Sequence, residues 1–140
     1  MLANGAKLGY SKTAPSGSST TYTDLPGLKE IPDIGSDPEK VDNTVLTDPH
    51  KKYEKGISDL PEMTYKFKYD NSKADCPYRM LRQADKDGTT LYFRETDADK
   101  STIDFAAQVS VKRTGGGVNG AIEFEVTMMV QSDITYTDPA

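Results

Sequence analysis

Apolar and polar residues alternate with a period of two over two long segments near the end of the chain. Side chains of a strand point alternately to opposite faces, so each segment predicts a strand with one buried face and one polar face. The apolar faces carry Ile103, Phe105, Ala107, Val109 and Val111 in residues 103–113, and Ile122, Phe124, Val126, Met128 and Val130 in residues 121–131. Residues 114–120 include three consecutive glycines and predict the tip of a hairpin.

The arms of this hairpin are long. At about 3.3 Å per residue each arm would reach roughly 35 Å, whereas an ordinary strand has about 5–6 residues. Long strands expose rows of unpaired backbone N–H and C=O groups unless another segment pairs with them or covers them. The hairpin therefore favours a protein that assembles with other chains over one that catalyses a reaction.

One segment, residues 76–86, predicts a helix. Asp75 is the expected N-cap, Pro77 is tolerated in the first turn, and Gly88 is the expected stop. The apolar stripe of this helix consists of Cys76, Met80, Leu81 and Ala84. A stripe of this width predicts that the helix packs against a sheet.

The rest of the chain predicts short strands and polar connections. Strands are expected at residues 6–10, 41–47, 62–70, 89–95 and 134–136. Residues 1–21 are expected to form a mobile N-terminal arm, because residues 11–21 are rich in Ser, Thr, Gly and Pro. Residues 48–61 are expected to form a long polar loop. The pattern predicts a mainly β (α+β) fold, a β-sandwich or barrel flanked by one α-helix, in a single domain spanning residues 1–140.

Composition narrows the class of function. The chain has 140 residues, 35% of them hydrophobic, a formal net charge of −5 and a pI of about 4.9. An acidic protein lacks the cationic surface that a general nucleic-acid binder needs. The sequence has no apolar run of about 18 residues, so no membrane contact is expected. The N-terminus lacks the apolar segment of a secretory signal, so we expect the chain to be made in a cytoplasm.

Residue types that carry catalysis or metal binding do not form a recognisable motif. His50 is the only histidine and lies in a charged loop, and Cys76, the only cysteine, lies on the apolar stripe of the predicted helix. The Asp-rich segments that begin at Asp85 and Asp97 lack the Gly and Glu of an EF-hand loop. We therefore expect no catalytic residues, no cofactor and no metal.

The order of segments resembles a known family. Residues 25–35 lead through residues 39–48 and a charged loop, residues 53–60, into the strand of residues 63–69. The predicted helix, residues 91–94 and the long hairpin follow. This succession resembles the major tail proteins, or tail tube proteins, of long-tailed, siphovirus-type bacteriophages. The resemblance covers about residues 20–131.

The resemblance implies a structural virion protein. Such proteins assemble as hexameric rings that stack into a hollow tube, and the genome passes through the lumen without specific binding. The implied partners are other copies of this chain, the tail tape-measure protein, and the tail terminator and baseplate proteins, with no membrane. The implied location is the virion tail, assembled in the cytoplasm of the bacterial host.

Two surfaces are hypotheses that follow from the resemblance. The arm of residues 1–21 and the loop of residues 48–61 are candidates for contacts between stacked rings, with plain surface loops as the alternative. The polar face of the hairpin is a candidate lining of the lumen, with solvent or a neighbouring subunit as the alternative. The candidate stacking residues are His50, Lys51, Lys52, Tyr53, Glu54 and Lys55, and the candidate lumen residues are Asp104, Glu123 and Glu125.

Two other functions remain open on the sequence. One is the tube protein of a contractile tail or injection machine, which shares the fold and would be accompanied by a sheath protein. The other is a monomeric β-sandwich that binds a ligand. The chain has no Trp, which counts against a binding module that presents aromatic platforms.

Overall fold

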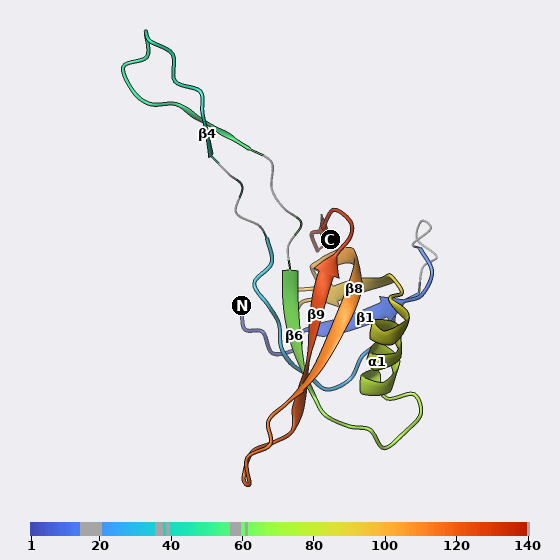
Figure 1. Ribbon diagram of the computed structural model, residues 1–140. Coiled ribbons are helices and arrows are strands. Elements are labelled where there is room, and N and C mark those ends of the chain that lie inside the picture. The colour runs from blue at the N-terminus through green and yellow to red at the C-terminus, as the bar shows by residue number, and fades with distance from the viewer. Residues whose placement is uncertain (15–20, 36–37, 39, 57–59, 61, 140) are drawn as a thin grey trace.

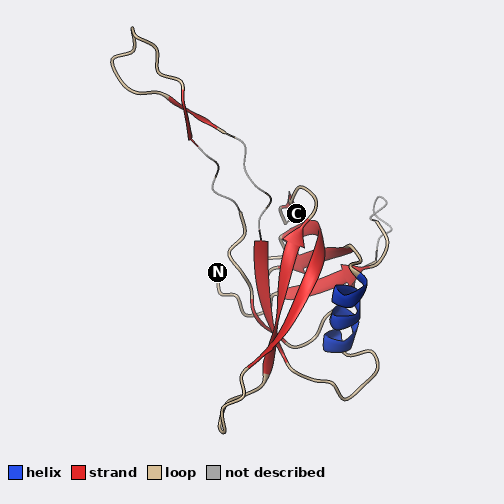
Figure 2. Ribbon diagram, in the orientation of Figure 1, coloured by secondary structure: helices blue, strands red, loops and turns tan. Residues whose placement is uncertain are grey.

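The computed structural model of the chain describes residues 1–14, 21–35, 38, 40–56, 60 and 62–139 (Figure 1). Strands dominate, and one helix lies on one side of them (Figure 2). In chain order the elements are β1 (Lys7–Ser11), β2 (Thr23–Asp24), β3 (Leu28–Glu30), β4 (Lys40–Asp42), β5 (Tyr53–Lys55), β6 (Glu62–Lys68), α1 (Pro77–Asp87), β7 (Leu91–Thr96), β8 (Thr102–Thr114), β9 (Glu123–Val130) and β10 (Thr135–Thr137). The described residues thus form the mainly β fold with one helix that the sequence predicts.

The strands form one large antiparallel sheet and one small ribbon. The order of the large sheet is β2-β1-β7-β8-β9-β6-β3, with β10 paired to β8. The strands β4 and β5 pair only with each other among the described strands and make a separate ribbon. In Figure 1 this ribbon projects away from the rest of the chain.

The large sheet folds over into two layers, and β8 takes part in both. One layer contains β2, β1, β7 and the first half of β8, and the other contains the second half of β8 with β9, β6 and β3. The first half of β8 pairs with β7, from Thr102 opposite Thr96 to Ala107 opposite Leu91. Its second half pairs with β9, from Ala107 opposite Val130 to Thr114 opposite Glu123. In Figure 1, β1 runs across the direction of β6 and β9, so the strands of the two layers cross. In such packings a strand that passes from one layer to the other forms the corner.

The apolar faces of the two layers enclose the core. Phe67 and Phe124 stack with ring centroids 5.2 Å apart, and Phe93 and Phe105 stack at 5.6 Å. The apolar positions predicted for the hairpin are buried, except that Val111 is half-buried and Ile122 is 43% exposed. Ile122 is exposed because β9 begins at Glu123, two residues later than the predicted arm of residues 121–131.

The helix α1 covers the free edge of the second half of β8. Leu81 and Ala84 are buried, and Gly88 ends the helix with a left-handed φ of 68°. The Asp85 carboxylate accepts a hydrogen bond of 3.1 Å from the Val111 backbone N–H. The predicted N-cap, Asp75, is wrong: the helix starts one residue later, after Cys76, with no side-chain hydrogen bond at the cap.

Three predicted segments differ from the structure. The strand of residues 41–47 shortens to Lys40–Asp42, and the loop of residues 48–61 contains β5, because the two segments pair as a ribbon. In the arm of residues 1–21, the strand predicted at residues 6–10 is present as β1, which pairs with β7 and buries Leu8 completely, so this part of the arm belongs to the large sheet. Of the segment expected to be mobile, residues 15–20 lie outside the described residues.

One carboxyl group lies inside the core. Glu95 on β7 is 1% exposed and accepts a hydrogen bond of 2.9 Å from the Tyr65 hydroxyl on β6, which belongs to the other layer. The carboxyl of Asp97 lies within hydrogen-bonding reach of Glu95, and its Oδ1 is buried without a partner among the described residues. Burial, together with the neighbouring Asp97, raises the pKa of Glu95 to about 7, although the Tyr65 hydrogen bond opposes the shift. A protonated Glu95 can donate to Asp97 Oδ1 while it accepts from Tyr65.

This arrangement predicts that the fold loses stability as pH rises. The pKa of Glu95 is raised from an ordinary 4.5 to about 7, so its protonation stabilises the fold fully below 4.5 and the effect is lost as pH rises through 7. The size of the loss is on the order of 3 kcal/mol. In Glu95→Gln the amide can still accept a hydrogen bond from Tyr65 and donate one to Asp97. We therefore expect chemical unfolding of this variant to give a free energy of unfolding that does not change between pH 5 and 8. Glu123→Gln is the control, because Lys29 lowers the pKa of Glu123 and that group titrates below this window. Parallel pH curves for the wild type and Glu95→Gln would contradict the prediction.

Candidate functional site

The ribbon formed by β4 and β5, with its tip, is a hairpin of residues 40–55. Lys40 pairs with Lys55, and Asp42 pairs with Tyr53. At the tip, the Asn43 N–H donates to the Lys52 carbonyl at 2.8 Å, and the Val45 N–H donates to Asp48 Oδ2 at 3.0 Å. The tip therefore has a defined shape, although it is fully outside the large sheet.

The hairpin of residues 40–55 exposes apolar side chains. The exposed fractions are 49% for Val41, 57% for Val45, 106% for Leu46 and 54% for Tyr53. Isolated two-stranded ribbons are marginal in water, and exposed apolar groups gathered on one projection are typical of a contact with another molecule. This hairpin is the strongest candidate interaction surface in the described part of the chain.

The candidate stacking residues fall on this hairpin. His50, Lys51 and Lys52 are exposed in the tip, and Tyr53, Glu54 and Lys55 form β5. Sequence reasoning missed the apolar residues Val41, Val45 and Leu46 as surface groups. The sequence did contain a signal for this exposure, because the short β-branched run between Asp42 and Pro49 has too few apolar positions to pack on a sheet.

The candidate lumen residues all lie on the polar side of the large sheet, but each is beside a cation. Asp104 accepts two hydrogen bonds from Arg94, of 2.7 and 3.0 Å. Glu123 accepts a hydrogen bond of 2.6 Å from Lys29 Nζ, which lowers the pKa of Glu123. These two carboxylates belong to different ends of the hairpin and are not brought together.

The third carboxylate, Glu125, lies between two lysines. It pairs across the sheet with Lys66 on β6 and with Lys112 on β8, and Lys66 Nζ is 3.8 Å from its Oε1. The polar face made by β6, β8 and β9 is therefore mixed in charge, with alternating signs across neighbouring strands. Its next row is neutral, with Thr64, Thr127 and Ser110 side by side.

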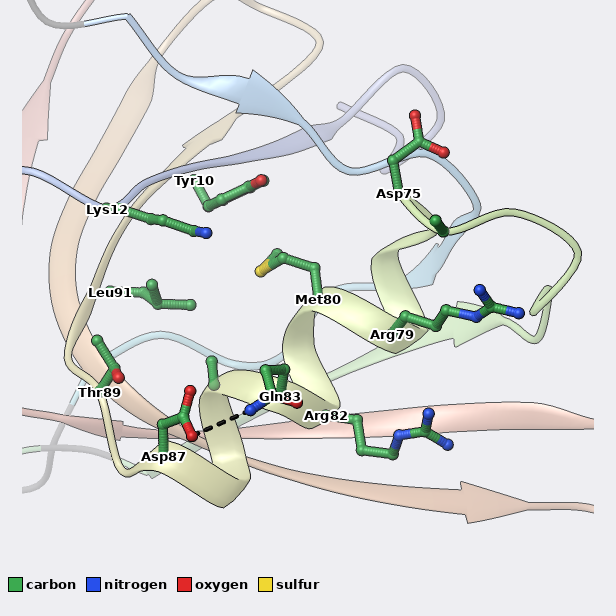
Figure 3. A pocket seen from close by; sticks show the side chains of 12 residues that line it. Tyr10, Lys12, Asp75, Arg79, Met80, Arg82, Gln83, Asp87, Thr89 and Leu91 are labelled. Carbon is green, nitrogen blue, oxygen red and sulfur yellow. Dashed lines mark hydrogen bonds between the residues drawn. The ribbon is translucent and has the colours of Figure 1, made fainter.

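A recess of about 550 Å³ lies between α1 and the strands β1 and β7 (Figure 3). Tyr10, Met80 and Leu91 line it, and the Gln83 amide donates to Asp87 at 3.0 Å. Its two carboxylates, Asp75 and Asp87, lie at opposite ends of the helix in Figure 3. No acid–base pair converges on this recess among the side chains described, so the recess offers no catalytic arrangement.

The other chemical candidates are also structural. Cys76 is buried at the start of α1 and accepts a hydrogen bond of 3.2 Å from the Lys73 N–H. In the described ranges, no group of three or more His, Cys, Asp or Glu side chains is placed to hold a metal ion. Among the described helical residues, none forms a helix that is long and apolar enough to cross a membrane.

The fold and its surfaces define a class: a mainly β protein built on one large antiparallel sheet, with one helix and a projecting hairpin that exposes apolar side chains. The sequence profile of the phage tail tube protein family (TTP) matches residues 9–139, and the chain belongs to this family. It is accordingly a structural component of the virion tail and not an enzyme. No curated protein gives a significant match.

Solved structures share the fold at low sequence identity. A chain from the tail of an empty gene transfer agent (GTA) particle with C6 symmetry has a TM-score of 0.63 and 14% identity, covering 94% of this chain and 93% of that one. A chain of the SPP1 tail tube has a TM-score of 0.61 and 14% identity, and the match covers 96% of this chain and 77% of that one. A chain from the baseplate of the anti-feeding prophage (AFP) has a TM-score of 0.59 and 7% identity, and the match covers 95% of this chain and 92% of that one.

The pairing of Asp104 can be measured. Arg94 holds Asp104 with two hydrogen bonds, and its guanidinium also lies 4.5 Å from the centre of the Tyr22 ring. In a double-mutant cycle with Arg94→Gln and Asp104→Asn, which removes both charges, we expect a coupling energy of about 0.5–1 kcal/mol, because the pair is partly exposed. Chemical unfolding of the four proteins measures this energy. If the two changes in the free energy of unfolding simply add in the double variant, Asp104 is not coupled to Arg94 and the prediction is wrong.

Proposed function

We propose that six copies of this chain close into a ring and that the rings stack into the tube of a phage tail, the conduit for genome delivery. The observation that carries the proposal is the hairpin of residues 40–55, whose apolar side chains are exposed in a single copy. Family membership supports it. So does the similarity of fold to a chain from a GTA tail with C6 symmetry.

Strand edges support lateral contacts within the ring. β3 pairs with β6 only at Lys66 and Phe67, so in the described parts of the chain the first half of β6 has a strand on one side only. Its outward backbone groups are available to a strand of a neighbouring copy. Closure into a ring removes such edges and with them the risk of uncontrolled pairing.

The polar face of β6, β8 and β9 lines the lumen in this proposal. The opposite face of these strands packs on the core, where Phe124 meets Tyr78 of α1 at 5.2 Å between ring centroids. The helix then lies on the outside of the tube. A lining in which Lys66, Lys112 and Glu125 alternate has no strong field of one sign, so DNA phosphates gain little from stopping on it.

The partners of the tube follow from the same proposal. The tape-measure protein would occupy the lumen during assembly, and terminator and baseplate proteins would close the two ends. DNA would pass through without specific binding. Assembly would take place in the host cytoplasm before the tail joins the virion.

A second candidate function is the tube of a contractile tail or injection machine. The similarity of fold to a chain from the AFP baseplate favours it, because that likeness is nearly as strong as the likeness to the SPP1 tail tube. A sheath protein encoded beside this one would decide for the contractile machine. A monomeric ligand-binding module is disfavoured by family membership.

The hairpin provides the first test. Replacing residues 43–52 by Asn-Gly joins Asp42 to Tyr53, which already face each other, through a turn suited to two-residue hairpins. We expect an unchanged melting temperature, because none of the buried core residues described comes from residues 40–56. Negative-stain microscopy and light scattering should show no tubes. Tubes of wild-type length from the shortened chain would refute the role of the hairpin in stacking.

The lumen lining provides the second test. Ser110 is exposed on the polar face of β8 and has no charge to disturb, so Ser110→Lys adds a cation without breaking an ion pair. We expect normal tails but slower genome release in a dye-based ejection assay, because each added cation holds phosphate. The control is Gln83→Lys on the exposed side of α1, which should release DNA at the wild-type rate. Equal slowing by both variants, or by neither, would count against this orientation of the sheet.

A further inference from the structure

A second recess lies at the end of the β3–β6 pair that is remote from the projecting hairpin. Its volume is about 530 Å³, and Leu28, Tyr69 and Ile122 line it together with Lys29 and Lys68. Ile122 is 43% exposed, while Leu28 and Tyr69 are half-buried. We call these residues the base recess. It is apolar, open and unused by the elements described so far.

The base recess has a defined shape because three segments are tied together there. The Lys68 N–H donates to the Gly27 carbonyl at 2.8 Å, and the Tyr69 N–H donates to the Ile122 carbonyl at 3.3 Å. The Tyr69 ring also packs edge-on against Tyr78 of α1, with centroids 4.9 Å apart. An exposed apolar site with a fixed backbone loses little conformational freedom when it binds a partner.

The hairpin of residues 40–55 and the base recess lie at opposite ends of β6. The hairpin of residues 40–55 precedes the first residue of β6, Glu62, while the base recess follows its last residue, Lys68. Seven residues of strand separate them by about 20 Å. Figure 1 shows the same arrangement, with the hairpin beyond one end of β6 and the β8–β9 tip beyond the other.

An apolar projection and an apolar recess at opposite ends of one chain fit a head-to-tail contact. Each copy can donate its hairpin to the next copy and accept one from the copy before it, and such contacts continue without closing. The exposed Val45 and Leu46 at the tip of the hairpin supply the apolar side chains.

We propose that the base recess is the acceptor for the tip of the hairpin from a second copy of this chain, in the adjacent ring. The inference rests on the proposed tube function and adds the receiving surface. Leu28, Tyr69 and Ile122 then bind the apolar tip, and Leu46 enters the recess.

A cysteine pair tests the contact directly. We expect assembled tubes of a Leu46→Cys, Ile122→Cys protein to give a ladder of covalent multimers under mild oxidation, since every copy carries a donor and an acceptor. Cys76 is buried and stays in place, and each single variant serves as its control. A pair of Leu46→Cys with Gln83→Cys on α1 should form tubes but no ladder. A ladder with Val118→Cys at the β8–β9 tip, and none with Ile122→Cys, would overturn the proposal.

A matched pair of substitutions tests the energetics without crosslinking. Ile122 directly precedes β9 and Met129 lies near the other end of that strand, and the two side chains are 43% and 40% exposed. Ile122→Asp should raise the concentration needed for tubes by about tenfold or more, because a carboxylate is costly to bury in an apolar contact. Met129→Asp should leave that concentration nearly unchanged. Equal effects of the two variants would overturn the acceptor site.

The outcomes separate the acceptor from the function on which it rests. If the wild-type protein forms tubes but Leu46→Cys, Ile122→Cys gives no ladder, the acceptor is wrong and the tube function stands. If the wild-type protein forms no tubes at any concentration, the proposed function itself fails.

Discussion

The rest of the structure depends on β8 and its place in two layers. Because its first half pairs with β7 and its second half with β9, one strand of thirteen residues sets the angle at which the layers meet. At the corner the alternation of burial stops, and Phe105, Ala106 and Ala107 are buried in succession. Ala106 is covered where the Gln131 N–H donates to its carbonyl and its own N–H donates to the Ser132 hydroxyl. The two small residues leave room for that crossing, so the corner is encoded locally.

The corner also explains how a carboxyl group is accommodated inside the core. β6 and β7 are separated by two strands in the order of the sheet, yet the Tyr65 hydroxyl reaches Glu95 because the sheet folds over at β8. The hydrogen bond joins the two layers on the inside, much as the Arg94–Asp104 pair joins neighbouring strands on the outside. A buried carboxyl costs free energy unless it is neutral and fully bonded, which is the state that the raised pKa of Glu95 favours.

Much of the fold could be predicted from the sequence, because period-two alternation fixes which face of a strand is buried. That signal placed the long hairpin and the strand of residues 62–70, and the short strand predicted at residues 134–136 is present as β10. The helix was placed by a different signal, its apolar stripe with Pro77 at the start and Gly88 at the end. The same signal could not reveal the ribbon of β4 and β5, where no face is buried and alternation has no energetic meaning. It also could not show that Lys29 pairs with Glu123, a contact between residues 94 positions apart. The acidic appearance of the hairpin in the sequence thus becomes a charge-balanced face in the fold.

The separation of the hairpin of residues 40–55 from the buried core determines what a substitution in each part affects. The buried side chains described come from the large sheet, α1 and, in Leu25 and Cys76, the segments beside them, whereas residues 40–55 are nearly all exposed and hold their shape through hydrogen bonds at the tip. In the proposed tube, substitutions in the hairpin would therefore act on contacts between copies with little effect on the free energy of unfolding of one copy. Substitutions along the corner strand β8 act on both, since any change in the angle between the layers also moves β6, which connects the hairpin to the opposite end of the molecule. In the proposed tube, β8 therefore couples the stability of one copy to its assembly with the next.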